Sequence, residues 1–239
     1  MVEIAAILSG GLATRLRPLT EKIPKALVDV AGKPFIDRQL TLLHKKGMRH
    51  VVLCLGYRGQ EVERAVGNGE RWGLKVDYSY DGPELLGTAG ALRKAGCYLG
   101  DLFWVLYGDS YLDFDYRAVS DYFELHGAAK LGLMTVFANE NKWDKSNVVF
   151  EKGQLLRYDK PKQSPEMHHI DYGAAILRES ALDLIPKRPY DLAHLYSQLV
   201  DSGLLLGYEI TERFYEVGSY EGIEDAARYF AELDKQNVV

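Results

Sequence analysis

Short apolar runs alternate with amphipathic segments along the first half of the chain. The apolar runs have the length of buried strands, which predicts strands at residues 4–8, 51–55, 74–80 and 104–106. The segments between and after them repeat apolar positions at helical spacing, which predicts helices at residues 35–46, 59–66, 88–95 and 115–126. Strands that alternate with helices indicate parallel βαβ units.

The pattern changes near residue 130, after which strand-like runs follow one another with fewer helical segments between them. We expect strands at residues 131–137, 147–150, 155–158 and 170–177, and helices at 192–202 and 220–233. Lys152-Gly153 lies between two of these strands and predicts a hairpin turn. We find no internal repeat or linker. The chain is therefore expected to form one Rossmann-like α/β domain over residues 1–239, with a mostly parallel mixed sheet and helices on both faces.

A loop rich in glycine and arginine follows the first predicted strand. It runs from Gly10 to Pro18 and is closed by Pro24-Lys25. Paired glycines let the backbone approach a ligand closely, and their N–H groups can converge on an anion. Arginine supplies a planar fork for phosphate oxygens, and lysine adds a mobile charge. Each feature alone is also typical of a turn with solvated charges, but together they predict a site for a nucleoside triphosphate.

Further glycines and an acid come at the carboxyl ends of later strands, where open parallel sheets bind ligands. Gly56 follows the second predicted strand, and Gly87-Thr88 begins a helix whose free N–H groups we expect to face the ligand. Asp109 follows another strand. Taken alone, an acid at this position is as typical of a turn as of a functional site. Beside a triphosphate it becomes a candidate magnesium ligand, with Glu216 as the second acid. Glu216 is equally compatible with a simple helix-start acid.

Composition narrows the class of protein further. A formal net charge of −5 argues against general nucleic-acid binding. No apolar run is long enough to span a bilayer, and the N-terminus lacks a signal-peptide pattern, so we expect no membrane partner and a cytoplasmic enzyme. Cys54 and Cys97 lack metal-ligand spacing, and Cys54 is expected to be a small buried apolar side chain.

Several other motifs carry less weight. Lys160 precedes a proline and, taken alone, is typical of a surface lysine. His168, His169 and Asp171 are close in sequence, but adjacent side chains of a strand point to opposite faces, so we expect no metal site there. The sequence contains no Walker A motif, no G-x-G-x-x-G and no nucleophile elbow. These absences disfavour a P-loop NTPase, a dinucleotide oxidoreductase and an α/β-hydrolase.

The motifs together resemble those of the sugar-1-phosphate nucleotidyltransferases, also called nucleotide-sugar pyrophosphorylases. That family opens with Gly-Gly-x-Gly-Thr-Arg-Leu, then Arg-Pro-Leu-Thr and Pro-Lys, which residues 10–20 and 24–25 match closely. Residues 86–92 look like its nucleoside-binding segment, and Gly108-Asp109 is similar to its metal motif. Residues 159–161 resemble its Glu-Lys-Pro, and residues 214–219 its late Asp-x-Gly-Thr segment.

The resemblance implies an enzyme of the nucleotide-diphospho-sugar transferase fold that condenses an NTP with a sugar-1-phosphate, with Mg²⁺ as cofactor. The nucleotide-binding half would cover roughly residues 1–128 and the sugar-phosphate half roughly 129–239. Arg15 and Lys25 would be catalytic, and Asp109 and Glu216 would hold the metal. The remaining site residues would be Leu8, Gly10, Gly11, Thr14, Gly56, Gly87 and Thr88 for the nucleotide, and Lys160, Asp171 and Gly173 for the sugar phosphate. Many relatives form homodimers.

Residues 86–91 look most like those of mannose- and heptose-1-phosphate guanylyltransferases. The alternatives are a uridylyltransferase for hexose or amino-sugar phosphates, a phosphocholine-type cytidylyltransferase and a non-catalytic nucleotide-sugar binding protein. Three positions depart from the family pattern. Ala13 replaces a glycine, so we expect no positive φ there. Glu216 replaces the usual Asp, and Asp171-Tyr172-Gly173 stands where Asn-Ala-Gly is common.

Overall fold

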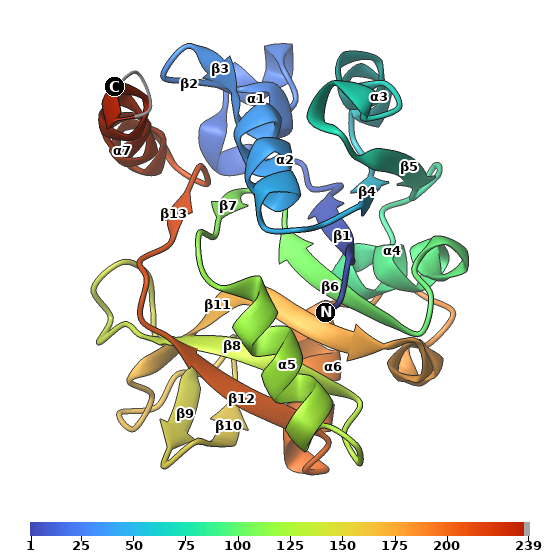
Figure 1. The fold of residues 1–239 in the computed structure, drawn as a ribbon, viewed down its shortest axis with the longest axis vertical. Helices are drawn as coiled ribbons and strands as arrows, with labels where there is room; N and C mark the ends of the chain where they lie inside the picture. The colour runs from blue at the N-terminus through green and yellow to red at the C-terminus, as the bar shows by residue number, and fades with distance from the viewer. Residues whose placement is uncertain (237–239) are drawn as a thin grey trace.

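The computed structural model describes residues 1–236 and contains a nine-stranded mixed sheet within them. The strands of its first half are β1 (Ile4–Ser9), β4 (His50–Leu55), β5 (Lys75–Tyr80) and β6 (Leu102–Tyr107). They are parallel and lie in the order β6–β1–β4–β5 (Figure 1). Their carboxyl ends therefore meet at one edge of the sheet. All four strands were predicted, and only their bounds differ by a few residues.

Helices cover both faces of this parallel region. One face carries α2 (Phe35–Lys45), α3 (Gly59–Val66) and α5 (Tyr116–His126), and the other carries α4 (Gly87–Ala95) and α6 (Leu192–Asp201). Ala5 and Ile7 of β1 pack in the first layer, whereas Ala6 packs in the second, because side chains alternate along a strand. Burial on both faces explains why these strands are continuous apolar runs. The predicted α/β arrangement is confirmed.

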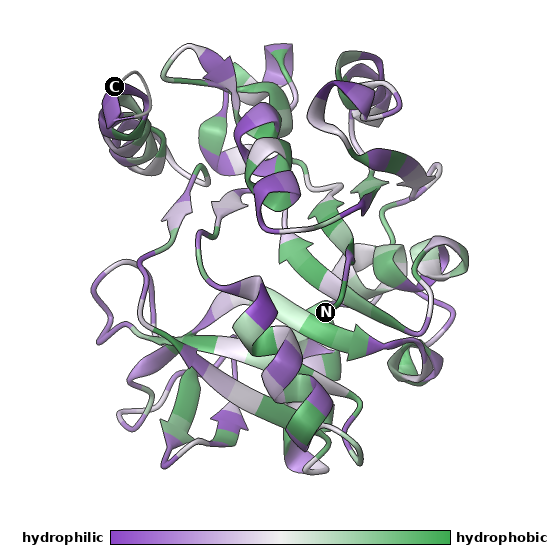
Figure 2. Cartoon of the chain, in the orientation of Figure 1, coloured by the Kyte–Doolittle hydropathy of each residue, from purple (hydrophilic) through white to green (hydrophobic). Residues whose placement is uncertain are grey.

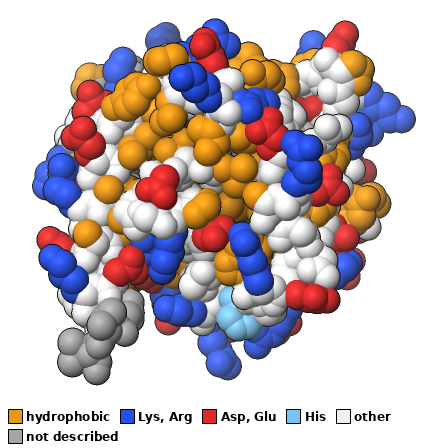
Figure 3. All heavy atoms as spheres, turned by 90° about the horizontal axis from the view of Figure 1, so that it is seen from above, with side chains coloured by type: hydrophobic (Ala, Val, Ile, Leu, Met, Phe, Trp, Pro, Cys, Tyr) orange, Lys and Arg blue, Asp and Glu red, His pale blue; other side chains and the backbone are white. Residues whose placement is uncertain are grey.

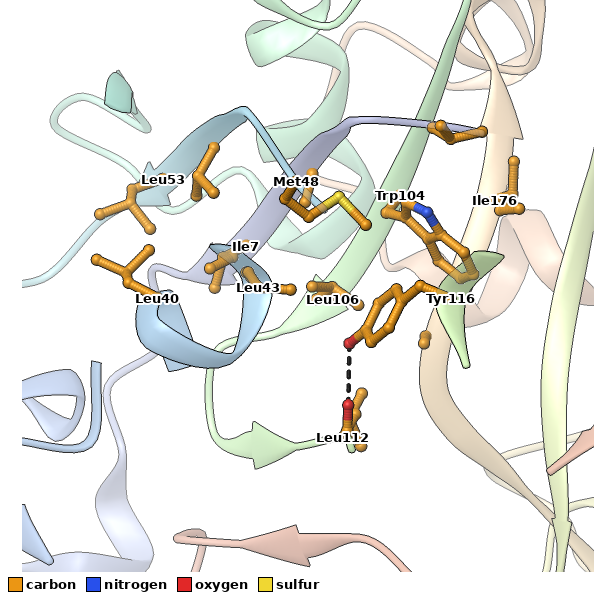
Figure 4. Close-up of a cluster of buried hydrophobic side chains, with 14 of the residues drawn as sticks. Ile7, Leu40, Leu43, Met48, Leu53, Trp104, Leu106, Leu112, Tyr116 and Ile176 are labelled. Carbon is orange, nitrogen blue, oxygen red and sulfur yellow. Dashed lines mark hydrogen bonds between the residues drawn. The ribbon is translucent and has the colours of Figure 1, made fainter. Parts of the chain in front are cut away.

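The first of these layers contains the largest buried side chains of the sheet. Trp104 of β6 lies against Tyr116 at the start of α5, with ring centroids 4.9 Å apart in an edge-on arrangement (Figure 4). The Tyr116 hydroxyl donates to the Leu112 carbonyl oxygen at 3.1 Å, so its polar atom is satisfied inside the core. Figure 2 shows the same concentration of hydrophobic residues along the central strands. This packing fixes β6, whose carboxyl end carries part of the site.

The second half of the chain extends the sheet through antiparallel pairs, except that β12 lies parallel to β8. These are β8 (Gly132–Ala138), β9 (Val148–Glu151), β10 (Gln154–Tyr158), β11 (His169–Arg178) and β12 (Leu205–Ile210). β11 pairs with both β6 and β8, which joins the two halves into one continuous sheet. Lys152 and Gly153 both have positive φ, 51° and 78°, and connect β9 to β10. The predicted hairpin turn is confirmed, and β12 is a strand that the sequence did not predict.

Short elements complete the fold around the edge of the sheet. They are α1 (Leu19–Lys22), β2 (Asp29–Val30), β3 (Lys33–Pro34), β7 (Ser110–Tyr111) and β13 (Tyr215–Glu216). The long C-terminal helix α7 (Tyr220–Gln236) packs through Phe230 against Tyr111, with ring centroids 4.7 Å apart. β13 pairs antiparallel with β7, so that Glu216 lies opposite Ser110. This small sheet brings two segments more than a hundred residues apart to the same place.

Polar and charged residues dominate the outer surfaces of the helices. On the face that is uppermost in Figure 1, acidic and basic side chains are interspersed around an apolar centre (Figure 3). Within residues 1–236, no helix combines the length and the apolar character that are needed to cross a lipid bilayer.

Candidate active site

A pocket of about 500 Å³ opens at the carboxyl ends of the parallel strands and reaches β11. Both halves of the chain line it. Most of the residues predicted from the sequence are part of its lining, namely Leu8, Gly10, Gly11, Arg15, Lys25, Gly87, Thr88, Asp109, Lys160, Asp171, Gly173 and Glu216. The fold therefore brings together residues that are up to about two hundred positions apart.

Thr14 and Gly56 lie just outside this lining. Thr14 is exposed at the start of a 3₁₀ turn, and its carbonyl oxygen accepts a hydrogen bond from Arg17 N at 3.2 Å. Gly56 packs directly on the opening loop, since a Cβ there would lie 2.5 Å from the Gly10 carbonyl oxygen. The Tyr57 N–H donates to the same oxygen at 3.4 Å. Gly56 thus lets the loop after β4 support the loop after β1.

Side chains from distant elements hold the opening loop in place. Leu16 is fully buried, and its carbonyl oxygen accepts a hydrogen bond from the Tyr220 hydroxyl of α7 at 3.1 Å. The Thr20 hydroxyl donates to the Ala13 carbonyl oxygen at 2.9 Å. Arg15 remains exposed and lies beside Gly218, because a Cβ added there would come within 2.9 Å of an Arg15 guanidinium nitrogen. The anchored backbone therefore presents the exposed Arg15 guanidinium to the pocket.

The expectation for Ala13 was wrong. Its φ of 48° and ψ of 44° place it in the left-handed region, where the family has glycine. Ala13 is held in this conformation because Leu16 is buried and the Thr20 hydroxyl is bonded to the Ala13 carbonyl oxygen. Left-handed backbone costs an L-residue with a Cβ roughly 1–2 kcal/mol. The loop therefore carries local strain at this residue.

Ala13→Gly is expected to raise the free energy of unfolding by about 0.5–1 kcal/mol. The strain of the left-handed alanine disappears, while the greater freedom of glycine in the unfolded chain offsets part of the gain. Urea unfolding curves should shift to a higher midpoint at an unchanged slope. Ala227→Gly, in the interior of α7, is the matched control and should lose about 1 kcal/mol or more. A lower unfolding free energy for Ala13→Gly would contradict this account.

Two acids meet where β7 pairs with β13. The Val217 N–H donates to the Asp109 carbonyl oxygen at 2.8 Å, which fixes the backbone of both segments. Lys25 reaches Asp109 from the opening loop, and its Nζ lies 2.7 Å from Asp109 Oδ2 in a partly buried ion pair. Glu216 lines the same pocket. Lys25 of the opening loop thus lies in the same pocket as Asp109 and Glu216, which come from two other segments.

The two carboxyls respond to this site in opposite ways. Partial burial acts to raise the pKa of Asp109, but the charge and hydrogen bond of Lys25, helped by Arg15, outweigh it and hold the pKa below its usual value. Burial raises the pKa of Glu216, and the negative charges of Asp109 and Asp144 raise it further. Glu216 is therefore a carboxylate whose negative charge is unfavourable in this environment.

A divalent cation fits these two acids. Carboxylate oxygens are the ligands that Mg²⁺ prefers, and a cation between them would relieve the repulsion that raises the pKa of Glu216. Within residues 1–236, no group of three or more His, Cys, Asp and Glu is arranged to hold a metal. The rest of the coordination shell would come from phosphate oxygens and water, as is usual for this ion.

The side of the pocket at β11 is built around a partly buried acid. Asp171 accepts hydrogen bonds from Gly173 N at 3.0 Å and from the Tyr107 hydroxyl at 3.2 Å. Its own N–H donates to Asn147 Oδ1 at 2.9 Å. Burial raises the pKa of Asp171 above its usual value. Lys160 Nζ lies 5.4 Å from the centre of the Tyr107 ring, so a cation and a hydrogen-bonding carboxyl stand together here.

The two histidines near Asp171 bind separate acids. His168 Nδ1 lies 3.0 Å from Glu140, and His169 Nε2 lies 3.2 Å from Glu209. His169 is the first residue of β11 and His168 lies directly before it.

A family model described as "Nucleotidyl transferase" matches residues 4–230 of the chain. The chain belongs to the nucleotidyl transferase family. It is 32% identical over 219 residues to the mannose-1-phosphate guanylyltransferase catalytic subunit beta of Xenopus tropicalis, covering 90% of this chain and 61% of that protein. It is 30% identical over 216 residues to the UTP–glucose-1-phosphate uridylyltransferase of a Synechocystis strain, covering 84% of this chain and 56% of that protein. The chain thus spans less than two thirds of the length of these two relatives.

Solved structures share the fold of this nucleotidyl transferase at lower identity. A putative glucose-1-phosphate thymidylyltransferase from Bacillus anthracis superposes with a TM-score of 0.82 at 17% identity, covering 95% of this chain and 94% of that chain. HddC from Yersinia pseudotuberculosis gives a TM-score of 0.79 at 23% identity, covering 96% and 100%. At these identities the likeness establishes the fold.

The N-terminus of α4 differs from the expectation of free N–H groups. Ala89 N and Gly90 N both donate to the Tyr190 carbonyl oxygen, at 3.0 and 3.2 Å. The Thr88 hydroxyl accepts from Leu192 N at 2.7 Å. A Cβ on Gly87 would lie 2.6 Å from the Tyr190 oxygen, so this glycine admits the loop before α6. Residues 89 and 90 therefore offer no free amides to a nucleotide, and the sequence around them gave no sign of the distant partner.

Sequence reasoning missed several residues of the pocket lining, among them Asp81, Tyr107, Asp144 and Asn147. Asp81 follows β5 as Asp109 follows β6, and this common position at the carboxyl end of a strand was a usable signal. Asp144 and Asn147 lie in the loop before β9, and Asn147 was predicted only as the first residue of that strand. Cys54 is buried as predicted, and burial raises its pKa to about 12, so the thiol is an inert part of the wall.

Proposed function

We propose that this protein is a sugar-1-phosphate nucleotidyltransferase, which joins an NTP and a sugar-1-phosphate to give an NDP-sugar and pyrophosphate. One observation carries the proposal: cations from both halves of the chain, Arg15, Lys25 and Lys160, line one pocket together with the acids Asp109 and Glu216. Two phosphorylated substrates in one pocket each need cations to bind their phosphates. The two acids would hold the metal ion that neutralises phosphate charge. The family supports the same class of reaction.

The proposed reaction needs positioning and charge neutralisation more than proton transfer. A phosphate oxygen of the sugar-1-phosphate attacks the α-phosphorus of the NTP in line, and pyrophosphate leaves. That oxygen is already negatively charged at neutral pH, so no general base is required. Arg15, exposed on an anchored loop, would bind the departing β- and γ-phosphates. Lys160, beside Asp171, would hold the incoming sugar phosphate.

Asp109 and Glu216 would hold Mg²⁺, which neutralises phosphate charge and aligns the two substrates when it is bound. Lys25 is bonded to Asp109 in the free protein. The same side chain would neutralise charge that develops near the α-phosphate, because it reaches the pocket from the loop that holds the triphosphate. Water in the site would be displaced as the two substrates fill the pocket.

The similarity to relatives suggests which nucleotide and which sugar phosphate the protein uses. Guanylyl transfer to a mannose- or heptose-type 1-phosphate is the proposal that fits the similarity to mannose-1-phosphate guanylyltransferases. Uridylyl transfer to a hexose 1-phosphate is the second candidate, because a uridylyltransferase is similar over most of the chain as well.

Release of pyrophosphate with a panel of substrates tests the proposal. The common nucleoside triphosphates are each combined with mannose-, heptose-, glucose- and amino-sugar 1-phosphates in the presence of Mg²⁺. GTP with a mannose- or heptose-type phosphate is expected to give the highest kcat/KM. If no pair releases pyrophosphate while nucleotide sugars still bind, the protein is a binding protein on an enzyme fold and the proposal fails.

Glu216→Gln is expected to stabilise the metal-free protein at pH 7. The raised pKa of Glu216 means that the folded protein holds the proton more tightly than the unfolded chain does. The contribution of this group to stability therefore falls as the pH rises from the unfolded pKa through the folded pKa, and is lowest above both. The neutral amide removes this penalty.

Thermal unfolding with and without Mg²⁺ measures the effect. Mg²⁺ should raise the Tm of the wild type and should have little effect on Glu216→Gln, because one of the two ligands is gone. Glu212→Gln, an exposed acid outside the pocket lining, is the matched control and should respond to Mg²⁺ like the wild type. An equal response of Glu216→Gln and the wild type would remove Glu216 from the metal site.

A further inference from the structure

Asp81 lines the pocket at the end of a different strand from the one that carries Asp109. It follows β5 directly, whereas Asp109 follows β6, and the sheet order β6–β1–β4–β5 separates the two strands by three spacings. Strands in a sheet lie about 4.8 Å apart, so the two acids are on the order of 14 Å apart along one edge. The opening loop after β1 lies between them. A triphosphate held by that loop with its α-phosphate near Asp109 would have its base directed toward β5.

The carboxylate of Asp81 is buried and only weakly engaged. The residue is 8% exposed and lines the pocket. Its backbone is fixed, because its N–H donates to the Leu55 carbonyl oxygen at 2.9 Å and its carbonyl oxygen accepts from Lys94 Nζ at 3.1 Å. The side chain accepts one long hydrogen bond, from Leu86 N to Oδ2 at 3.4 Å. Lys94 thus binds the backbone of Asp81 rather than its carboxylate, which leaves capacity to accept hydrogen bonds from a ligand.

Exposed apolar side chains belong to the same pocket. Leu12, Tyr57 and Leu85 are 42%, 46% and 42% exposed, and all three line it. Tyr57 follows β4, the neighbour of β5, and Leu85 lies in the loop that Asp81 begins. Large apolar side chains that stay exposed in a pocket are suited to a flat, apolar ligand face such as that of a nucleobase. A buried carboxylate beside them would meet the edge of that base.

We propose that Asp81 determines the choice of nucleobase and selects guanine. The inference rests on the proposed nucleotidyltransferase function and names the nucleotide that this site takes. An ionised carboxylate only accepts hydrogen bonds, through two oxygens side by side. Guanine offers two adjacent donors on its Watson–Crick edge, N1–H and the exocyclic amine, and so can form a bidentate pair with a carboxylate. Adenine, cytosine and uracil each place an acceptor next to a single donor, which brings a lone pair against one carboxylate oxygen.

Equilibrium binding of GTP and inosine triphosphate tests the inference without any sugar phosphate. Inosine triphosphate lacks only the exocyclic amine, so it loses one of the two donors. Calorimetry on the wild type is expected to show about 10- to 100-fold tighter binding of GTP, the range for one hydrogen bond to a charged group. Equal Kd values for the two nucleotides in the wild type would overturn the inference, and this result needs no variant.

Asp81→Asn places an amide where the second carboxylate oxygen stood and keeps an oxygen that can accept from Leu86 N. The ratio of the Kd values for inosine triphosphate and GTP is expected to fall to near one in this variant. Glu84→Gln, an exposed acid of the same loop outside the pocket lining, is the control and should keep the wild-type ratio.

Other outcomes separate the inference from the proposed function. If Asp81→Asn weakens both nucleotides by the same factor, the residue only supports the loop and the inference fails. If the wild type binds UTP or CTP more tightly than GTP, the inference also fails, while release of pyrophosphate with that nucleotide would leave the proposed function intact. Tight, amine-dependent binding of GTP without turnover would support the inference and count against the proposed function.

Discussion

Asp109→Ala is expected to lower turnover about 10²- to 10³-fold. The substitution removes one of the two acids proposed to hold Mg²⁺, and it leaves Lys25 without its partner at 2.7 Å. Groups that stabilise charge in the transition state contribute roughly 3–4 kcal/mol each, which corresponds to this loss of rate. Steady-state release of pyrophosphate measures it. The loss should fall mainly on kcat, because the charge that Asp109 organises develops during the reaction.

Asp113→Ala is the matched control for this variant. Asp113 lies four residues further along the same segment and pairs with Lys46 at 2.6 Å, outside the pocket lining. A surface ion pair of this kind contributes little, so turnover should stay within about twofold of the wild type. Equal turnover in Asp109→Ala and Asp113→Ala would show that Asp109 has no special part in the reaction.

Arg15→Ala is expected to reduce turnover by a similar two to three orders of magnitude. The Arg15 guanidinium is exposed in the pocket on a loop whose backbone is anchored by Leu16 and Tyr220. Its removal deletes the charge proposed to bind the departing pyrophosphate, while the buried anchors keep the loop folded. Arg15→Lys should recover only part of the activity, because lysine keeps the charge and loses the planar fork.

Arg17→Ala tests whether the loss of any positive charge from the loop lowers turnover, or only the loss of Arg15 from the pocket. Arg17 lies in the same loop but outside the pocket lining, and its nitrogen is 3.9 Å from Glu21 on the surface. We expect near wild-type turnover in this control. If Arg15→Ala and Asp109→Ala both retained near wild-type turnover, the mechanism given above would be wrong.

The sequence predicted the parts of the fold that have strong local signals. The first strand of the sheet and the helix that begins at Phe35 were found from local patterns. A continuous apolar run marks the strand and apolar positions at helical spacing mark the helix, and neither signal depends on distant residues. The hairpin at Lys152-Gly153 was found because its turn requires two residues of positive φ. The predicted helix that starts at residue 115 was found with its cap, since the Asp115 side chain accepts hydrogen bonds from Arg117 N and Ala118 N.

The strand β12 was missed because Gly207 interrupts its apolar pattern. That glycine is explained by packing, since a Cβ there would lie 2.5 Å from the ring of Phe150, which lies more than fifty residues earlier in the chain. β7 and β13 have two residues each, too few for any period to show. Their pairing depends on the rest of the fold, yet it is what places Glu216 near Asp109.

The candidate site was predicted best where glycine, arginine and acids follow strands. It was predicted worst where a residue depends on a distant partner. The positive φ of Ala13 depends on the burial of Leu16 and on the hydrogen bond from Thr20. The replacement of glycine by alanine does not by itself show these contacts. The amides at the start of α4 are occupied by the Tyr190 carbonyl oxygen, about a hundred residues away. Backbone conformation and hydrogen-bond partners of this kind are tertiary properties.

The fate of each phosphate of the nucleotide is the most direct test of the central claim, that the pocket transfers a nucleotidyl group. GTP labelled at the α- or the γ-phosphate is incubated with Mg²⁺ and the best sugar-1-phosphate of the panel. We expect the α-label to appear in a nucleotide sugar and the γ-label in pyrophosphate, and we expect Asp109→Ala to suppress both. Release of the γ-label as inorganic phosphate, with no α-label transferred to the sugar phosphate, would contradict it.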